Sequence, residues 1–179
     1  ISWSARLEDA FSKRFNVKYA IAHNSGTSTL HSCLHAAGIG AGDEVLIPTY
    51  TVICLAFAVI HQNAIPVFVD SDYDTFNMDP KDIEKKITPK TKAIIAVHMH
   101  GLPCDMDKIM DIAKKNNLVV IEDCAQSVLA KYKGKLTGSI GHMASFSFET
   151  KKHMTTSQGG IVITDNKIFA MNVINKIDY

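Results

Sequence analysis

The sequence predicts an α/β fold, a three-layer sandwich in which helices cover both faces of a mostly parallel central sheet. Short apolar runs rich in Val and Ile alternate along the chain with longer segments that have helical periodicity. The chain has 179 residues, of which 46% are hydrophobic, and this is enough to build one domain around a substantial core. We therefore expect a single domain over residues 1–179.

Seven segments are expected to form strands. Several of them are continuously apolar, which is typical of strands that are buried on both faces of a parallel sheet. In chain order, the predicted strands cover residues 18–24, 44–49, 65–70, 92–99, 118–124, 143–148 and 160–164.

Helices are expected between these strands. The first has an apolar stripe that includes Phe11 and Phe15. Asp79 followed by Pro80 is a helix-start signal. Residues 105–116 are acidic at their beginning and basic at their end, which suits the helix dipole. The predicted helices cover residues 4–15, 27–37, 51–62, 78–87, 105–116 and 166–179.

The bulk composition argues against several classes of function. The formal net charge is +1 and the charged residues are scattered, so we expect no nucleic-acid partner. No apolar run is long enough to span a bilayer, so no membrane partner is expected either. The four cysteines form no CxxC pair and indicate neither a zinc site nor a disulfide framework. Free thiols are typical of a cytoplasmic protein, which is the location we expect.

Two histidines, His98 and His100, alternate at the end of the fourth predicted strand. Residues spaced in this way point to opposite faces of a sheet, which disfavours a shared metal ion. We therefore expect no metal site, and we expect His98 to form a wall of the ligand site.

Ligands of parallel α/β sheets gather at the C-terminal ends of the strands. After the first predicted strand, Gly26, Thr27 and Ser28 open a helix. Free backbone N–H groups, the positive end of the helix dipole and hydroxyl groups can together bind an anion such as phosphate. The alternative is that a Ser or Thr only caps the helix, and this motif alone favours the cap.

Acidic residues end the strand predicted over residues 118–124. The carboxylate of Asp123 could pair with a cationic ring nitrogen, and Gln126 could donate a hydrogen bond beside it. The alternative is that Asp123 caps the segment that follows. The sequence favours neither interpretation over the other.

Two adjacent lysines, Lys151 and Lys152, follow the run Phe146-Ser147-Phe148. They could be two solvated cations on a loop, or one of them could be an amine nucleophile. A phosphate site, a carboxylate at a strand end and a lysine on a loop are together the groups that pyridoxal 5'-phosphate (PLP) requires.

Four segments of the chain have a distinctive order and spacing. They read NSGTSTLHSCLHAAGIGAGDEVLIPTYT, PVFVDSDYDTFNMDP, ITPKTKAIIAVHMHGLPCDMDKIMDIAKKNNLVVIEDCAQS and FSFETKKHMTTSQGG. Together they closely resemble the DegT/StrS family of PLP-dependent sugar aminotransferases of fold type I. The resemblance implies the PLP-binding large domain of such an enzyme, with an N-terminal segment and the C-terminal small domain missing. It also implies a homodimer.

The resemblance implies which lysine bonds to the cofactor. In the family, three residues separate this lysine from Phe-Ser-Phe, and here that position is Lys152. Asp123 is then expected to face the ring nitrogen, and Gln126 to lie near the phenolic oxygen of the ring. The phosphate is expected to be held by Gly26, Thr27, Ser28 and Ser147.

The chain departs from the family pattern at the ring and in the loop. Val52 stands where an aromatic residue usually stacks on the ring, so Tyr50 or Ile53 is the alternative cover. The usual Gly-Glu pair before Gly-Gly reads Ser157-Gln158.

The implied reaction moves an amino group from glutamate to a nucleotide-linked keto-deoxysugar, in the biosynthesis of cell-surface polysaccharides or glycosides. Some relatives that act as dehydratases carry a histidine in place of the lysine, so Lys152 favours transamination. Two kinds of alternative remain open. One is a related PLP enzyme, either a sugar dehydratase or a cyclitol aminotransferase, and the other is a truncated, non-catalytic remnant.

Overall fold

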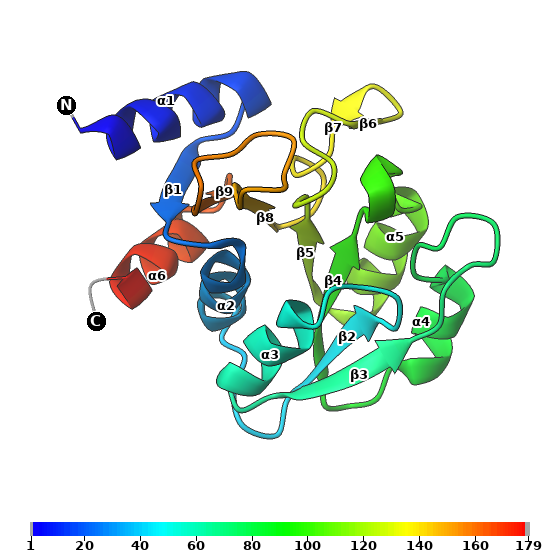
Figure 1. Ribbon diagram of the computed structural model, residues 1–179. Helices are drawn as coiled ribbons and strands as arrows, with labels where there is room; N and C mark the ends of the chain where they lie inside the picture. The colour runs from blue at the N-terminus through cyan, green and yellow to red at the C-terminus, as the bar shows by residue number, and fades with distance from the viewer. Residues whose placement is uncertain (1, 178–179) are drawn as a thin grey trace.

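The computed structural model describes residues 2–177, which form one seven-stranded sheet, a small hairpin and the helices around them (Figure 1). The strands of the sheet are β1 (Tyr19–His23), β2 (Glu44–Pro48), β3 (Ile65–Val69), β4 (Thr91–Val97), β5 (Val119–Asp123), β8 (Met143–Ser147) and β9 (Gly160–Thr164). The helices are α1 (Trp3–Phe15), α2 (Gly26–Ala36), α3 (Cys54–His61), α4 (Pro80–Lys86), α5 (Met106–Asn116) and α6 (Lys167–Ile177), with a short 3-10 turn, η1, at Met99–Gly101.

The sheet has the strand order β1-β9-β8-β5-β4-β2-β3. The pairs from β8 to β3 are all parallel, whereas β9 runs antiparallel to both β1 and β8. The prediction of a mostly parallel sheet is therefore confirmed. The carboxyl ends of β5 and β8 lie side by side, with Asp123 opposite Ser145 in the register.

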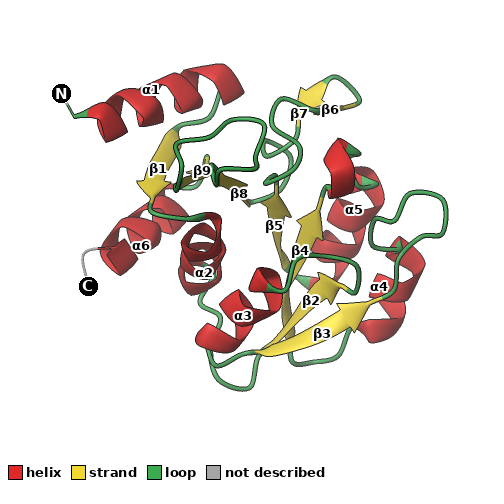
Figure 2. Cartoon of the chain, viewed as in Figure 1, coloured by secondary structure: helices red, strands yellow, loops and turns green. Residues whose placement is uncertain are grey.

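Helices cover both faces of the sheet, which gives the three predicted layers (Figure 2). One face packs against α2, α3 and α6, and the other against α4 and α5, with α1 beside the β8–β9 end. Successive residues of β4 show the division, because Ile94 packs with the α5 side and Ile95 with the α2 side. Both are fully buried, as expected for a strand between two layers.

The helix starts follow local sequence signals. Asp79 caps α4 by accepting a hydrogen bond from the Lys81 N–H, and Pro80 is its first residue, as predicted. Asp105 caps α5 in the same way. The helix expected from residue 51 begins only at Cys54, and no side chain caps it. The predicted last helix corresponds to α6, and its final two predicted residues, 178 and 179, lie outside the described residues.

A hairpin that the sequence analysis missed is formed by β6 (Lys131–Tyr132) and β7 (Lys135–Leu136). Its strands are two residues long, so they carry no usable periodicity. Within residues 2–177, none of the helices combines the length and the apolar character that a membrane span requires.

Candidate active site

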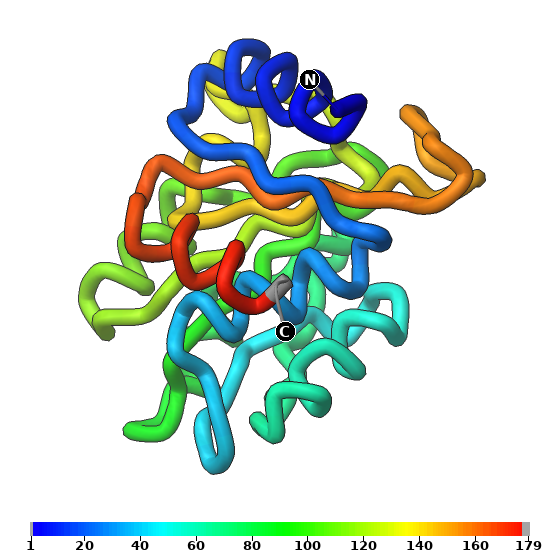
Figure 3. Tube along the Cα trace, turned by 90° about the vertical axis from the view of Figure 1, so that its left-hand side faces the viewer, coloured from blue at the N-terminus to red at the C-terminus, as the bar shows by residue number. Residues whose placement is uncertain are grey.

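A cavity of about 300 Å³ opens at the carboxyl ends of the parallel strands. It lies where the start of α2, the ends of β5 and β8 and the loop between β8 and β9 meet. In Figure 3 this loop, coloured orange, projects from the body of the domain. The side chains and backbone atoms that line the cavity belong to Ser25, Gly26, Thr27, Leu30, Thr51, Val52, Cys54, Val97, Asp123, Ala125, Gln126, Ser145, Ser147, Glu149, Lys152 and Gln158.

One end of the cavity is formed by the close approach of Gly26 to Ser147. A Cβ atom on Gly26 would lie 2.6 Å from the Ser147 Cβ and 2.9 Å from its Oγ, so only glycine fits there. Thr29 strengthens this contact, because its Oγ1 lies 2.5 Å from the Oγ of Ser145. The first N–H groups of α2 and the Ser147 hydroxyl consequently face one space, as an anion site requires. This arrangement fits a phosphate group.

Ser28, predicted to hold the phosphate as well, does not line this cavity. Its hydroxyl donates to Asn24 Oδ1 at 2.5 Å, and its backbone N–H donates to Ser25, which caps α2. Successive helix residues are rotated by about 100°, so three consecutive side chains cannot face the same point. The structure thus brings Gly26 and Thr27 to the cavity but turns Ser28 away.

The Asp123 side chain ends β5 and is only 6% exposed. One carboxylate oxygen accepts a hydrogen bond from the Ala125 N–H at 2.9 Å. Burial raises the pKa of Asp123, and the Ala125 N–H and the nearby Lys152 ammonium offset this only in part. A buried carboxyl with this tendency is suited to a cationic partner inside the cavity.

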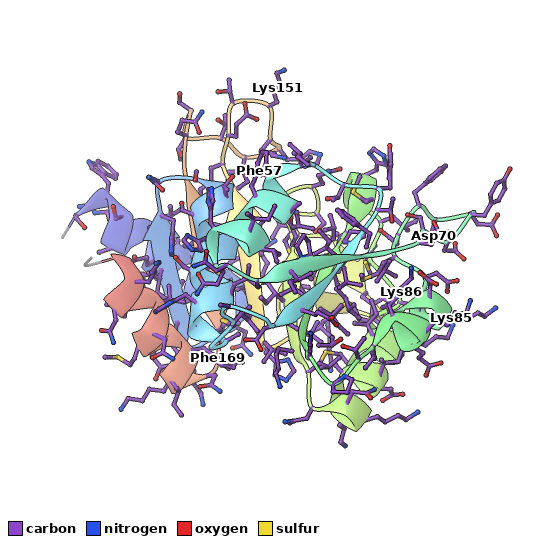
Figure 4. The ribbon with its side chains drawn as sticks, turned by 90° about the horizontal axis from the view of Figure 1, so that it is seen from below. Phe57, Asp70, Lys85, Lys86, Lys151 and Phe169 are labelled. Carbon is purple, nitrogen blue, oxygen red and sulfur yellow. The ribbon has the colours of Figure 1, made fainter. Side chains whose placement is uncertain are left out.

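The two adjacent lysines differ in position. Lys152 is half-buried and lines the cavity, whereas Lys151 is exposed and lies outside this cavity, on the outer side of the loop (Figure 4). A turn accounts for the difference, because the Lys152 N–H donates to the Glu149 carbonyl at 2.9 Å. Lys152 therefore shares the cavity with Asp123, as the sequence predicts.

Gln126, which is predicted to lie near the phenolic oxygen of the ring, also lines the cavity. Its Oε1 accepts a hydrogen bond from the backbone N–H of His100 at 2.9 Å. His98, by contrast, is fully buried and is not among the lining residues, so the prediction that it forms a wall of the site is wrong. Its ring points to the opposite face of the sheet, toward Glu122.

Comparison with known proteins identifies the family. The model of the DegT/DnrJ/EryC1/StrS aminotransferase family matches residues 3–175. The chain belongs to this family. It is 50% identical over 160 residues to a GDP-perosamine synthase from Caulobacter vibrioides, a match that covers 89% of the chain and 43% of that relative.

Two solved structures show the same fold. The aminotransferase from Psychrobacter cryohalolentis superposes with a TM-score of 0.96 at 44% identity, covering 98% of this chain and 45% of that one. NtdA from Bacillus subtilis, with bound cofactor PMP, has a TM-score of 0.91 at 33% identity and covers 98% and 40%. PMP is the aminated form of PLP. PLP is therefore the cofactor of the present chain, as a member of this family. The chain spans less than half the length of these relatives.

The departure at Val52 is visible in the structure. Val52 lines the cavity but is 51% exposed, so it covers the site only in part. Tyr50 does not line the cavity, because its ring lies against Phe76 and its hydroxyl is 3.3 Å from His100 Nε2. Ile53 is also absent from the lining and is 63% exposed. Among the three candidates for covering the ring, only Val52 faces the cavity.

Behind Asp123, on the reverse face of β5, lies a buried carboxylate that the sequence analysis did not single out. Glu122 accepts hydrogen bonds from His98 Nε2 at 3.0 Å and from the N–H groups of Gly138, Ile140 and Gly141 at 2.6 to 2.8 Å. Burial raises its pKa, but these donors outweigh burial, and the pKa of Glu122 lies below its ordinary value. The carboxylate fastens the turn before β8 to β5.

Side-chain atoms of His98, Glu122 and Cys124 that could bind a metal ion lie within 4.8 Å of one another. These groups are already engaged. His98 Nδ1 accepts from the Cys104 N–H, so its other ring nitrogen, Nε2, is the one that donates to Glu122. Burial raises the pKa of the Cys124 thiol well above its ordinary value. His98 and Glu122 therefore act as hydrogen-bonding groups, and the raised pKa of Cys124 disfavours the thiolate that a metal would need.

Sequence reasoning missed five other polar residues of the cavity wall, namely Ser25, Thr51, Cys54, Ser145 and Glu149, and it noted Gln158 only as a departure from the family pattern. Cys54 opens α3, and burial, followed by the charge of Asp123, raises the pKa of its thiol. Glu149 and Gln158 come from the two ends of the loop that carries Lys152. A signal was available for Glu149 and Gln158, because both flank the predicted lysine within this loop.

Proposed function

We propose that this chain is the PLP-binding large domain of an aminotransferase that moves an amino group from glutamate to the keto carbon of a nucleotide-linked deoxysugar. The observation that carries the proposal is that Lys152 and Asp123 line one cavity together with Gly26 and Ser147, which approach each other closely. The name of the Caulobacter vibrioides relative, GDP-perosamine synthase, supports a nucleotide-linked sugar as the amino acceptor.

When bound, the cofactor supplies an aldehyde that bonds to an amine and a ring that withdraws electrons from the substrate carbon. Asp123 would hold the proton on the ring nitrogen. A carboxylate in a nearly dry site forms a strong charge-assisted hydrogen bond with a cationic N–H group. Such a partner favours the ionised carboxylate and so counteracts the effect of burial on the pKa of Asp123.

Lys152 would act at its Nζ atom as a base and then as an acid. As a free amine, it would take the proton from the substrate carbon and then release it to a second carbon two bonds away. Its place on the loop allows this movement, because Lys152 lies in a turn and not inside a regular strand. Meanwhile the N–H groups of Gly26 and Thr27 and the Ser147 hydroxyl would anchor the phosphate.

Two further parts of the proposal concern the complete protein. We infer a homodimer, because Val52, Ile53 and Phe57 are between 49% and 63% exposed beside the cavity and on α3, and a second subunit would cover them. We place the reaction in the cytoplasm, where its products would feed polysaccharide or glycoside biosynthesis. The four free thiols support a reducing compartment.

The decisive experiment follows the cofactor spectrum. Adding glutamate to the PLP-loaded protein should convert the cofactor to its aminated form, and full turnover should give the parallel-line kinetics of a ping-pong reaction. Lys152→Ala should lose the absorbance band that the bound cofactor has near the edge of the visible range. It should also lose the conversion of the cofactor by glutamate. The neighbouring variant Lys151→Ala is the matched control and should keep the band. If glutamate leaves the wild-type spectrum unchanged, the protein is not an aminotransferase of this kind.

A further inference from the structure

A second cavity, of about 380 Å³, adjoins the cofactor cavity and is here called the outer cavity. Three residues, Ala125, Gln126 and Lys152, line both cavities, so Lys152 stands between them. The remaining lining residues of the outer cavity are His100, Lys151 and His153. Whatever reacts beside Lys152 can therefore extend into this space.

All ionisable side chains that line the outer cavity are basic. Four of its six residues are lysine or histidine, and none of them is acidic. The acid nearest in sequence, Glu149, lines the cofactor cavity and accepts a hydrogen bond from the Lys151 backbone N–H at 3.0 Å. Within residues 2–177, no ion pair involves Lys151 or Lys152. The cations of this cavity are therefore available to an anion from outside.

His100 is held in place by an unusual backbone conformation. Its φ of 53° and ψ of 21° lie in the left-handed region, which few residues other than glycine adopt. Its N–H is fixed to Gln126 Oε1, and its Nε2 lies 3.3 Å from the Tyr50 hydroxyl. Strain of this kind persists only where the surroundings hold the backbone firmly. The exposed imidazole is directed by its contact with the Tyr50 hydroxyl.

We propose that the outer cavity binds the anionic group of the reacting substrate, with Lys151, His153 and His100 as its donors. This inference rests on the proposed function. Both substrates of such a reaction carry a suitable group, since the amino donor has carboxylates and a nucleotide-linked sugar has a diphosphate. Several oxygens can then accept hydrogen bonds from lysine and imidazole N–H groups, and charge-assisted bonds of this kind are strong.

The test uses Lys151→Gln combined with His153→Gln in the PLP-loaded protein. Lys85→Gln is the matched control, because Lys85 is also an exposed lysine and lies on α4, far from the loop (Figure 4). Three quantities are measured: the KM for glutamate in the half-reaction, the Kd of inorganic pyrophosphate by calorimetry, and the Kd of PLP. The double variant removes two of the three proposed donors. We expect it to raise one of the first two quantities at least about tenfold, which is the factor for losing a single charge-assisted contact. The Kd of PLP should stay within about twofold, and the control should change none of the three.

The results separate the two anion sources. A change in the glutamate KM alone assigns the outer cavity to the donor carboxylate, and a change in the pyrophosphate Kd alone assigns it to the diphosphate. Unchanged values for both, or an equal loss of PLP affinity, overturn the proposal. Failure of the proposed function has a different signature, because the wild-type spectrum then does not respond to glutamate while pyrophosphate binding can still be measured. In His100→Asn, asparagine tolerates the left-handed conformation. This variant should weaken the binding of the same anion that the double variant affects.

Discussion

Replacing Glu122 with glutamine removes one charge while hardly changing the size of the side chain. In the structure, each carboxylate oxygen accepts two hydrogen bonds. Oε2 accepts from His98 Nε2 at 3.0 Å and from the Gly138 N–H at 2.8 Å. Oε1 accepts from the N–H groups of Ile140 at 2.8 Å and Gly141 at 2.6 Å. Glutamine has a single acceptor oxygen, so its NH₂ group must face two of these four donors.

The expected loss follows from that count. Two buried N–H groups would be left without an acceptor, and each costs about 1–3 kcal/mol. The free energy of unfolding should therefore fall by roughly 2–6 kcal/mol, which is a large share of the roughly 5–15 kcal/mol of a typical domain. The turn at residues 138–141 leads into β8, so the end that carries Ser147 should also lose its fixed position relative to Asp123.

Urea unfolding at pH 7, followed by circular dichroism, measures this loss. Glu44→Gln is the control, because Glu44 Oε2 accepts from the hydroxyl groups of Thr88 and Thr91 at 2.5 and 3.3 Å. Hydroxyl groups can rotate toward another acceptor, so we expect this control to lose less than about 1 kcal/mol. If Glu122→Gln unfolds within about 0.5 kcal/mol of the wild type, the four donors do not depend on the carboxylate, and the reasoning fails.

Three other substitutions test the site and its support. Asp123→Asn should weaken PLP binding, measured by titration. Burial raises the pKa of Asp123 in the folded protein above its value of about 3.9 in the unfolded chain. The stability that Asp123 contributes is therefore fully present below about pH 3.9 and is lost as the pH rises above it. The variant should therefore gain stability relative to the wild type between about pH 4 and pH 7 in urea unfolding without cofactor; a relative loss would contradict this. Gly26→Ala should cost about 1–3 kcal/mol through overpacking against Ser147, and adding Ser147→Gly should restore the stability but not the PLP affinity. Phe146→Ala should cost about 3–5 kcal/mol in thermal unfolding, because its ring packs edge-on against Phe11 and Phe15.

The strands and most helices could be predicted because their signals are local. Continuous apolar runs mark β4 and β5, and Asp79 with Pro80 marks the start of α4. The sequence predicts the start of α3 three residues too early, since no capping side chain precedes Cys54 and residues 51–53 turn without a sequence signal. Each of these outcomes depends on whether the local sequence contains a residue that begins or ends the helix or strand.

The site is harder to predict because its parts come from opposite ends of the chain. Asp123 and Ser147 line one cavity because β8 is the parallel neighbour of β5. Gly26 meets Ser147 because α2 begins at the end of β8 and packs along this strand. Periodicity along the sequence predicts neither neighbour. Only the chemistry that PLP requires, together with the resemblance to a family, combines the three motifs into one site.

The errors at Ser28 and His98 have one geometric cause. Strand-end residues alternate between the two faces of the sheet, and helix residues turn by about 100° each, so proximity in sequence to a site residue does not place a side chain in the site. Ser28 follows Thr27 directly and points to Asn24, and His98 follows the cavity residue Val97 and points to Glu122. By the same geometry, Lys151 faces away from the cofactor cavity that Lys152 lines. Exchanging the two chemical roles would therefore require a different turn at Glu149, and a lysine at position 151 cannot replace Lys152.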